Sequence, residues 1–371
     1  MTQERKRILV DAREFIPGRL TGIGRVLAGL LDALEANGNS IELVLAIQDR
    51  HFLPAVLRDR ANITAQKVPA PYFRSEMQLS KLSAKGFSLF ISPYPKLPLF
   101  GCACASVHII HDILDLTHMA YKKRLKTYFD RYRLKRALSL SDLTWYDSAW
   151  SLSETQREMG STGKNPRVRY PGINSSFNQM KSELDAYVLK KYGLDPGYVL
   201  IVGNGLPHKN PGVLLEISDR ITRKIVFVGV TEKNQRYWAL RFPNRRAKWI
   251  PHVEDAEFPS VIRGAFCLAQ PSTAEGYGYP PLEAMACGIP VVVSNIPVLF
   301  ETTGSTAIYA DPHDPGAWLQ AIETLEDEEI YGTHMQKGLK WVRPLLGREA
   351  WSKYISDVDE VLAASANDVY R

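Results

Sequence analysis

The sequence predicts an α/β protein built from two doubly wound domains, each a mainly parallel sheet with helices on both faces. The chain has 371 residues, about twice the length of one ordinary domain. Short apolar runs alternate with helical patterns, as expected for parallel strands joined by crossover helices. This alternation restarts after a polar, linker-like stretch at 178–197. We therefore expect one domain over 1–176 and a second over 177–355, with 356–371 crossing back to the first.

In the first half, four apolar runs bounded by turn residues predict strands. The first run leads through the loop FIPGRLTGIG into a helix that contains RVLAGLLDAL. The four runs are RILVDARE (7–14), IELVLAI (41–47), SLFISP (88–93) and SVHIIHD (106–112).

The second half repeats this rhythm with five predicted strands and helices between them. Its strands are YVLIVGNG (198–205), KIVFVGV (224–230), AKWIPHV (247–253), AFCLAQP (265–271) and IPVVVSN (289–295). The intervening helices lie within PGVLLEISDRI, NQRYWALRF, AEFPSVIRG and PPLEAMACG, and WSKYISDVDEVLAASA predicts a late helix. Such a sheet binds ligands at the carboxyl ends of its strands.

Composition favours a globular protein of the cytoplasm. Apolar residues make up 45% of the chain, charged residues make up 23%, and the formal charge is +6. We find no apolar run of about 18 residues and no signal-peptide core. The four cysteines show no zinc-site spacing, so we expect buried thiols and no metal site.

One segment is strongly basic. YKKRLKTYFDRYRLKR (121–136) has eight Lys or Arg residues against a single acid, Asp130, and its aromatic residues recur at helical spacing. We favour a helix that packs its aromatic stripe on the core and exposes a basic face. Contact with an anionic membrane is the alternative, and no motif supports a nucleic-acid partner.

The stretch STAEGYGYPPLEAMACGIPVVVS (272–294) follows the end of a predicted strand. Gly276 and Gly278 allow a ligand to approach the backbone closely. Pro281 suits the first position of a short helix, whose free amides attract a phosphate. Glu283 then falls in the first helical turn, where its carboxylate could stabilise the helix start or accept hydrogen bonds from ribose hydroxyls.

This stretch resembles the E-x7-E motif of family 4 retaining glycosyltransferases, also called group 1, which have the GT-B fold of two Rossmann-like domains facing a cleft. The two acids, the glycines, the double proline, the helix and the following strand occur in the same order. The resemblance implies that Glu275 contacts the donor sugar and that Glu283 binds the ribose. The loop from Gly276 to Tyr279 would line the sugar.

Other segments resemble the same family in the same order. TGIGRVLAGLLDAL resembles its glycine loop, with Gly22 and Gly24, whereas Leu27 at the third glycine position disfavours a dinucleotide fingerprint. VGNGLPHKN resembles its phosphate-binding stretch, which implies that Lys209 faces the diphosphate. Asn204 departs from the pattern, because many relatives have an arginine there.

Two further segments complete the resemblance. VHIIHDILDL places His111 at the end of a strand, where relatives contact the donor sugar or phosphate. WIPHVEDAEF resembles the base-recognition region, with backbone groups near Val253. The expected donor-binding residues are Gly22, Gly24, Asn204, Lys209, Val253, Glu275, Gly276, Tyr277, Gly278, Tyr279, Pro281, Leu282 and Glu283.

The resemblance implies retaining, metal-independent sugar transfer without a cofactor, with His111, Lys209 and Glu275 as catalytic residues. The donor would be GDP-mannose or a UDP-sugar. The acceptor would be a hydroxyl of a glycan or lipid-linked glycan in polysaccharide, O-antigen or glycolipid biosynthesis, and the basic segment would allow peripheral membrane contact. A nucleotide-sugar epimerase of the same fold and a non-catalytic sugar-nucleotide-binding protein remain the alternatives.

Overall fold

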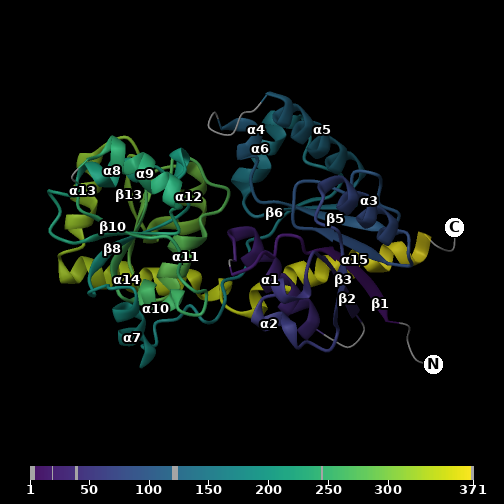
Figure 1. Ribbon diagram of the computed structural model, residues 1–371, viewed down its shortest axis with the longest axis horizontal. Helices are drawn as coiled ribbons and strands as arrows, with labels where there is room; N and C mark the ends of the chain where they lie inside the picture. The colour runs from purple at the N-terminus through teal and green to yellow at the C-terminus, as the bar shows by residue number, and fades with distance from the viewer. Residues whose placement is uncertain (1–4, 19, 38–40, 119–123, 244, 369–371) are drawn as a thin grey trace. The chain divides into compact units, whose positions relative to one another are not determined.

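The computed structural model describes residues 5–18, 20–37, 41–118, 124–243 and 245–368 (Figure 1). The chain divides into two compact units. The first comprises Met1–Gly172 and Gly347–Arg371, and the second comprises Ile173–Leu346. The sequence pattern places the corresponding boundaries at 176/177 and 355/356.

The first unit contains a parallel sheet of seven strands within the described residues, in the order β3-β2-β1-β4-β5-β6-β7. The four predicted strands are present, and β3, β6 and β7 were not predicted. β3 buries only its first residue, so its sequence lacks the apolar pattern of a strand. The strands are β1 (Lys6–Asp11), β2 (Ile41–Ile47), β3 (Ile63–Lys67), β4 (Leu89–Ser92), β5 (Ala105–Ile110), β6 (Leu143–Tyr146) and β7 (Pro166–Val168).

Helices surround this sheet, and the last one comes from the far end of the chain (Figure 1, yellow). Asp357 of α15 accepts hydrogen bonds from the Trp145 indole at 2.8 Å and from Arg169 at 2.7 Å. A Cβ at Gly172 would lie 2.5 Å from the Trp351 ring, so this glycine admits the tryptophan. The helices are α1 (Gly22–Ala36), α2 (Ala55–Arg58), α3 (Tyr72–Ser83), α4 (Leu114–Thr117), α5 (Arg124–Leu140), α6 (Ala149–Met159) and α15 (Ser352–Asp368), with 3-10 turns η1 (Arg50–Phe52) and η5 (Arg348–Trp351).

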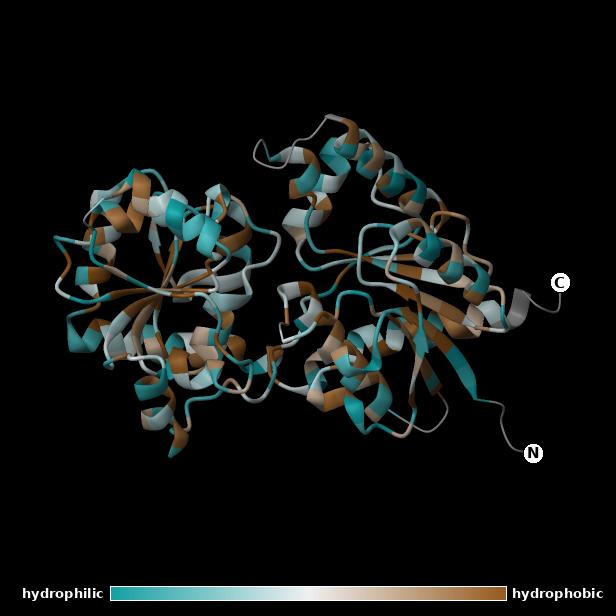
Figure 2. Cartoon of the chain, in the orientation of Figure 1, coloured by the Kyte–Doolittle hydropathy of each residue, from teal (hydrophilic) through white to brown (hydrophobic). Residues whose placement is uncertain are grey.

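The second unit has a parallel six-stranded sheet in its described residues, in the order β10-β9-β8-β11-β12-β13. All five predicted strands are present, and only the three-residue β13 was missed. Hydrophobic residues concentrate in the strands of each sheet (Figure 2). The strands are β8 (Tyr198–Val202), β9 (Ile225–Val228), β10 (Ala247–Ile250), β11 (Ala265–Gln270), β12 (Val291–Ser294) and β13 (Ile308–Ala310).

The helices of this unit are between 6 and 15 residues long in the described residues. They are α7 (Leu184–Lys191), α8 (Pro211–Glu216), α9 (Glu232–Arg241), α10 (Phe258–Arg263), α11 (Tyr279–Ala286), α12 (Pro297–Thr303), α13 (Pro315–Thr324) and α14 (Glu328–Val342), with 3-10 turns η2 (Pro207–Lys209), η3 (Gly304–Thr306) and η4 (Arg343–Leu345). In the described parts of both units, none of the helices combines the length and apolar character of a membrane span.

The basic segment forms α5, but its orientation differs from the favoured prediction. Leu125, Tyr128 and Tyr132 are 88%, 69% and 58% exposed, so the aromatic stripe does not pack on the core. The buried stripe comprises Arg133, Leu134, Ala137 and Leu138. The prediction was wrong because it assigned Arg133 to the solvated face, whereas this arginine pairs with the buried Glu76. Residues 121–123 of the predicted basic segment lie outside the described residues.

Candidate functional site

Two loops meet at the carboxyl edge of the second sheet. One follows β8 and the other follows β11, and the Thr273 amide donates to the His208 carbonyl at 2.8 Å. The second loop ends at Gly278, whose φ of 92° lies in the left-handed region. A Cβ there would lie 2.7 Å from Leu299 Cδ2, so both conformation and space require glycine.

The structure brings Lys209 and Glu275 together at this edge. Lys209 Nζ lies 2.6 Å from Glu275 Oε1, which also accepts from Ser272 Oγ at 2.6 Å and from the Gln270 amide. Glu275 is 9% exposed, and burial opposes its ionisation. The charge of Lys209 and the hydrogen bonds from Lys209 and Ser272 outweigh that effect and lower the pKa of Glu275.

Gln270 and Ser272 complete this cluster and were missed from the sequence. Both are buried, and the Gln270 amide also donates to Ser272 Oγ at 2.9 Å. Gln270 ends the otherwise apolar strand AFCLAQ, and a polar residue in that place is the signal that could have identified it.

Glu283 occupies a different place in its helix from the predicted one. α11 begins at Tyr279, so Glu283 is its fifth residue and lies in the second turn. Pro280 and Pro281 fill the first turn, where a missing amide hydrogen leaves no intrahelical bond unmade. Glu283 is 1% exposed. Gly276, Tyr277 and Leu282 are also buried, whereas Tyr279 is only partly buried.

Asn204 and Val253 lie in loops after β8 and β10. Asn204 Oδ1 accepts from the Leu206 amide at 3.1 Å, and its carbonyl accepts from the Asn234 side chain at 2.7 Å. These bonds show Asn204 shaping the loop. Val253 is buried, and the strand that was expected to reach it ends at Ile250.

In the first unit, the glycine loop is tied to neighbouring side chains. Gly22 is the first residue of α1, and Thr21 caps the helix by accepting from the Gly24 amide at 3.0 Å. The Thr21 hydroxyl donates to Glu14, and Tyr94 donates to the other oxygen of Glu14 at 2.9 Å. No sequence pattern indicates these contacts of Glu14.

His111 follows β5 and uses both ring nitrogens within the protein. Nδ1 lies 2.5 Å from Asp147 Oδ2, and Nε2 lies 3.0 Å from the Pro93 carbonyl. Burial opposes protonation, but Asp147 outweighs it and raises the pKa of His111. Two acceptors around one ring favour the imidazolium, which carries a positive charge at this edge of the first sheet.

The chemistry available in the second unit suits a ligand with both negative charge and hydroxyl groups. Lys209 supplies a cation, and Glu275 supplies carboxylate oxygens that can accept from hydroxyls. Over the described ranges, no three or more His, Cys, Asp or Glu side chains gather in a way that could hold a metal ion.

Comparison with known proteins supports the family indicated by these motifs. Residues 189–340 match the family model of the group 1 glycosyl transferases. Over 246 residues, the chain is 28% identical to the O-antigen chain mannosyltransferase B of Escherichia coli. That match covers 63% of this chain and 65% of the relative, so it spans less than two thirds of the relative's length.

Solved structures match nearly the whole fold at low sequence identity. A sucrose-phosphate synthase from Thermosynechococcus elongatus superposes with a TM-score of 0.79 at 19% identity, covering 97% of this chain and all of that one. HepE from Anabaena, in complex with UDP and glucose, gives 0.75 at 18% identity, covering 96% of this chain and all of that one. The chain therefore has the GT-B fold of two parallel Rossmann-like sheets, and its residues 189–340 match the group 1 glycosyl transferases.

Proposed function

We propose that this protein transfers a sugar from a nucleotide-diphospho-sugar to an acceptor hydroxyl with retention of configuration. The observation that carries the proposal is the Lys209–Glu275 pair at 2.6 Å, set at the carboxyl edge of the second sheet. A bound donor would replace the contact between Lys209 and Glu275 with contacts from its own groups to each of these side chains. Its diphosphate would take the lysine, and its sugar hydroxyls would donate to the carboxylate.

The proposed reaction is a front-face displacement. The bond between the anomeric carbon and the diphosphate oxygen breaks as the acceptor oxygen bonds to the same face of the sugar. The leaving diphosphate takes the acceptor's proton, so the atoms and charges balance. Lys209 and the loop amides stabilise the developing negative charge, and we propose that they make a metal ion unnecessary.

We assign donor binding to the second unit and acceptor binding to the first. The mannosyltransferase relative favours mannose as the transferred sugar, and the UDP-bound neighbour supports a nucleotide diphosphate at the donor position. We further propose that Glu283 binds the ribose and that the His111 imidazolium contributes positive charge near the donor. The acceptor would be a glycan or lipid-linked glycan.

Lys209→Met tests the proposal directly. We expect turnover of the preferred donor, found by a thermal-shift screen of nucleotide sugars, to fall about 10²- to 10³-fold through lost stabilisation of the leaving group. Lys224→Met is the matched control, because Lys224 pairs with Asp195 on the surface of the same unit. Equal turnover in the two variants would refute the assignment of Lys209.

A second proposal concerns α5. Its exposed Leu125, Tyr128 and Tyr132 stand on a helix that also carries exposed Lys126 and Lys135. We propose that this face contacts anionic membrane, because aromatic and basic side chains together suit the headgroup region.

Vesicle sedimentation tests this contact. Replacing Tyr128 and Tyr132 by serine should weaken binding to vesicles that contain phosphatidylglycerol. Tyr187→Ser is the control, since Tyr187 is exposed on α7 of the second unit. Unchanged binding of the double variant would contradict the proposal.

A further inference from the structure

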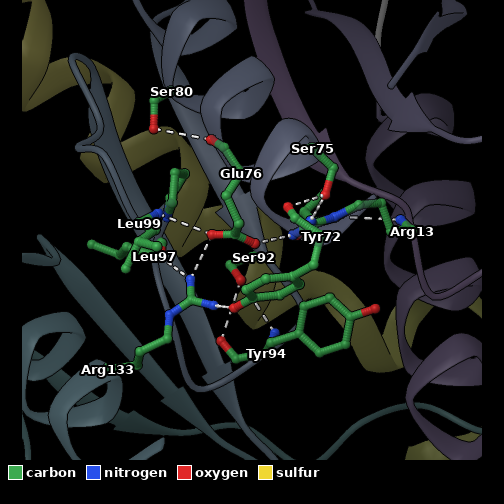
Figure 3. A network of polar contacts seen from close by, with 12 residues as sticks. Arg13, Tyr72, Ser75, Glu76, Ser80, Ser92, Tyr94, Leu97, Leu99 and Arg133 are labelled. Atoms are coloured by element: carbon green, nitrogen blue, oxygen red, sulfur yellow. Dashed lines mark hydrogen bonds and ion pairs between the residues drawn. The ribbon is translucent and has the colours of Figure 1, made fainter. Parts of the chain in front are cut away.

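A network of charged side chains lies at the carboxyl edge of the first sheet (Figure 3). Arg13 pairs with Asp11 at 2.6 Å and with Glu76 at 2.8 Å, and Arg133 reaches the other oxygen of Glu76 at 2.7 Å. Glu76 is 0% exposed and also accepts from the Leu99 amide at 2.9 Å. The two buried carboxylates are therefore each paired with arginine.

Lys96 lies beside this network but pairs with none of its carboxylates. Its Nζ is 4.5 Å from the centre of the Tyr94 ring and 5.7 Å from that of Tyr72. Throughout the part of the chain that the structure describes, no Asp or Glu lies within ion-pair distance of this ammonium group. Its nearest favourable contacts are thus two aromatic faces.

Both rings are held in place by the surrounding network. Tyr94 donates to Glu14 at 2.9 Å, and its amide donates to Ser92 Oγ at 3.3 Å. The Tyr72 hydroxyl accepts a hydrogen bond from the Arg133 guanidinium (Figure 3). Because Glu14 also accepts from Thr21, the cap of α1, hydrogen bonds connect the Tyr94 ring to the glycine loop.

The ammonium group of Lys96 lacks a nearby anion that would compensate its charge. Desolvation is the largest cause of the lowered pKa of Lys96; the charges of Arg133 and Arg13 lower this pKa further and outweigh, with desolvation, the opposite effect of Asp11 and Glu76. An anion within hydrogen-bond distance would reverse that effect. The side chain is only partly buried, so a ligand can reach it.

Apolar side chains are exposed on α3 close to Tyr72, beside the exposed Arg74. Phe73 packs edge-on against Tyr72 with ring centres 5.7 Å apart, and Phe73 and Met77 are both exposed on α3. A ligand that joins a negative charge to an apolar group would find both of its parts matched here.

We propose that Lys96, Tyr94 and Tyr72 form an anion subsite in the first unit that binds the phosphate group of the acceptor substrate. The identity of the ligand as acceptor rests on the proposed glycosyl transfer. The subsite itself rests on the unpaired ammonium group and its aromatic supports. The ligand class is a phosphate or diphosphate ester, with free pyrophosphate as the alternative source of the same chemistry.

Residue-resolved amine labelling of the full chain tests the subsite without an activity assay. Lys209→Met serves as the background protein, so that a lysine of the donor site does not compete. We expect inorganic pyrophosphate or citronellyl diphosphate to slow labelling of Lys96 at least about fivefold, read by mass spectrometry of its peptide. Lys81 is the internal control, because it is an exposed lysine of α3.

The two probes separate the sources of phosphate. Protection at lower concentrations of citronellyl diphosphate supports an ester with an apolar group, whereas stronger protection by pyrophosphate assigns the site to a free anion and overturns its acceptor role. Equal labelling of Lys96 with and without both probes overturns the subsite.

Variants at Lys96 connect the subsite to transfer. We expect Lys96→Met to raise the acceptor KM about tenfold or more, as for a lost hydrogen bond to a charged group, and Lys96→Arg to restore much of it. Donor affinity should stay unchanged in both. An unchanged acceptor KM in Lys96→Met would overturn the acceptor role. Absence of donor turnover in the wild type would instead refute the proposed function, while the labelling result would still decide whether the anion subsite exists.

Discussion

The carboxyl edges of the two sheets use charge in different ways. In the second unit, one lysine and one glutamate pair directly and are surrounded by the neutral donors Gln270 and Ser272. In the first unit, arginines neutralise the buried acids and Lys96 is left on two aromatic rings. A ligand of the second edge must replace a carboxylate, whereas a ligand of the first can add to a cation already in place. To judge how each edge can bind an anionic ligand, it is therefore more informative to ask whether each cation already has a carboxylate partner than to count the charges.

Among the variants considered, we expect Glu76→Gln to have the largest effect on stability. It removes the charge that balances Arg13 and Arg133, so we expect the free energy of unfolding of the first unit to fall by about 3–5 kcal/mol. Denaturant titration measures the loss. Glu42→Gln is the control, because the Arg7–Glu42 pair is only partly buried, with side chains 41% and 30% exposed, and should contribute less than about 1 kcal/mol. Similar losses in both variants would show that the buried network contributes no more to stability than the Arg7–Glu42 pair.

Glu275→Gln asks whether the pair of the second edge is functional or structural. The change removes the charge but keeps the shape, and we expect turnover to fall about 10²-fold through the loss of a charged contact to the reacting sugar. The free energy of unfolding should change far less than in Glu76→Gln. A large loss of stability with turnover retained would show that the Lys209–Glu275 pair has a structural role and not a functional one.

His108 gives the first unit a sensitivity to acid. Both ring nitrogens lack a hydrogen-bond partner among the described residues, and burial lowers the pKa of His108 to about 3. The unfolded chain takes up this proton near pH 6.5, but the folded chain does not. Stability is therefore complete above about pH 6.5 and falls by up to about 1.4 kcal/mol per pH unit as the pH drops toward 3.

Unfolding of His108→Leu followed across this pH range measures the effect of that histidine. The variant should show a shallower pH dependence than the wild type in the first unit. The same slope in both proteins would assign the acid sensitivity to other groups.

Gly278→Ala should lower the stability less than Glu76→Gln does. Its positive φ and the nearby Leu299 predict a loss of about 1–2 kcal/mol, together with weaker nucleotide binding because the α11 loop shifts. Gly332→Ala is the control of opposite sign, because Gly332 lies within α14 with open space around it and alanine favours helix. Thermal unfolding with and without nucleotide compares them, and a neutral Gly278→Ala would contradict the conformational argument.

The sequence predicted the second unit better than the first for a physical reason. The loop from Glu275 to Gly278 and its helix are contiguous, so spacing and turn chemistry reveal them. Glu76 and Arg133 are far apart in the sequence, and no local pattern shows that they meet. Arg133 was counted with the basic residues of 121–136 that were expected on the solvated face. The start of α11 was missed by two residues because Pro280 and Pro281 both fit its first turn.

The position of α15 in the first unit has a consequence for synthesis on the ribosome. Trp145 and Arg169 cannot meet Asp357 until residues 347–371 have been translated, although their own sheet strands emerge much earlier. The second unit, Ile173–Leu346, is contiguous and can complete its core first. The part of the protein that is made first is therefore the part that matures last, and its sheet, not yet covered by α15, is the segment that chaperones would meet on the nascent chain.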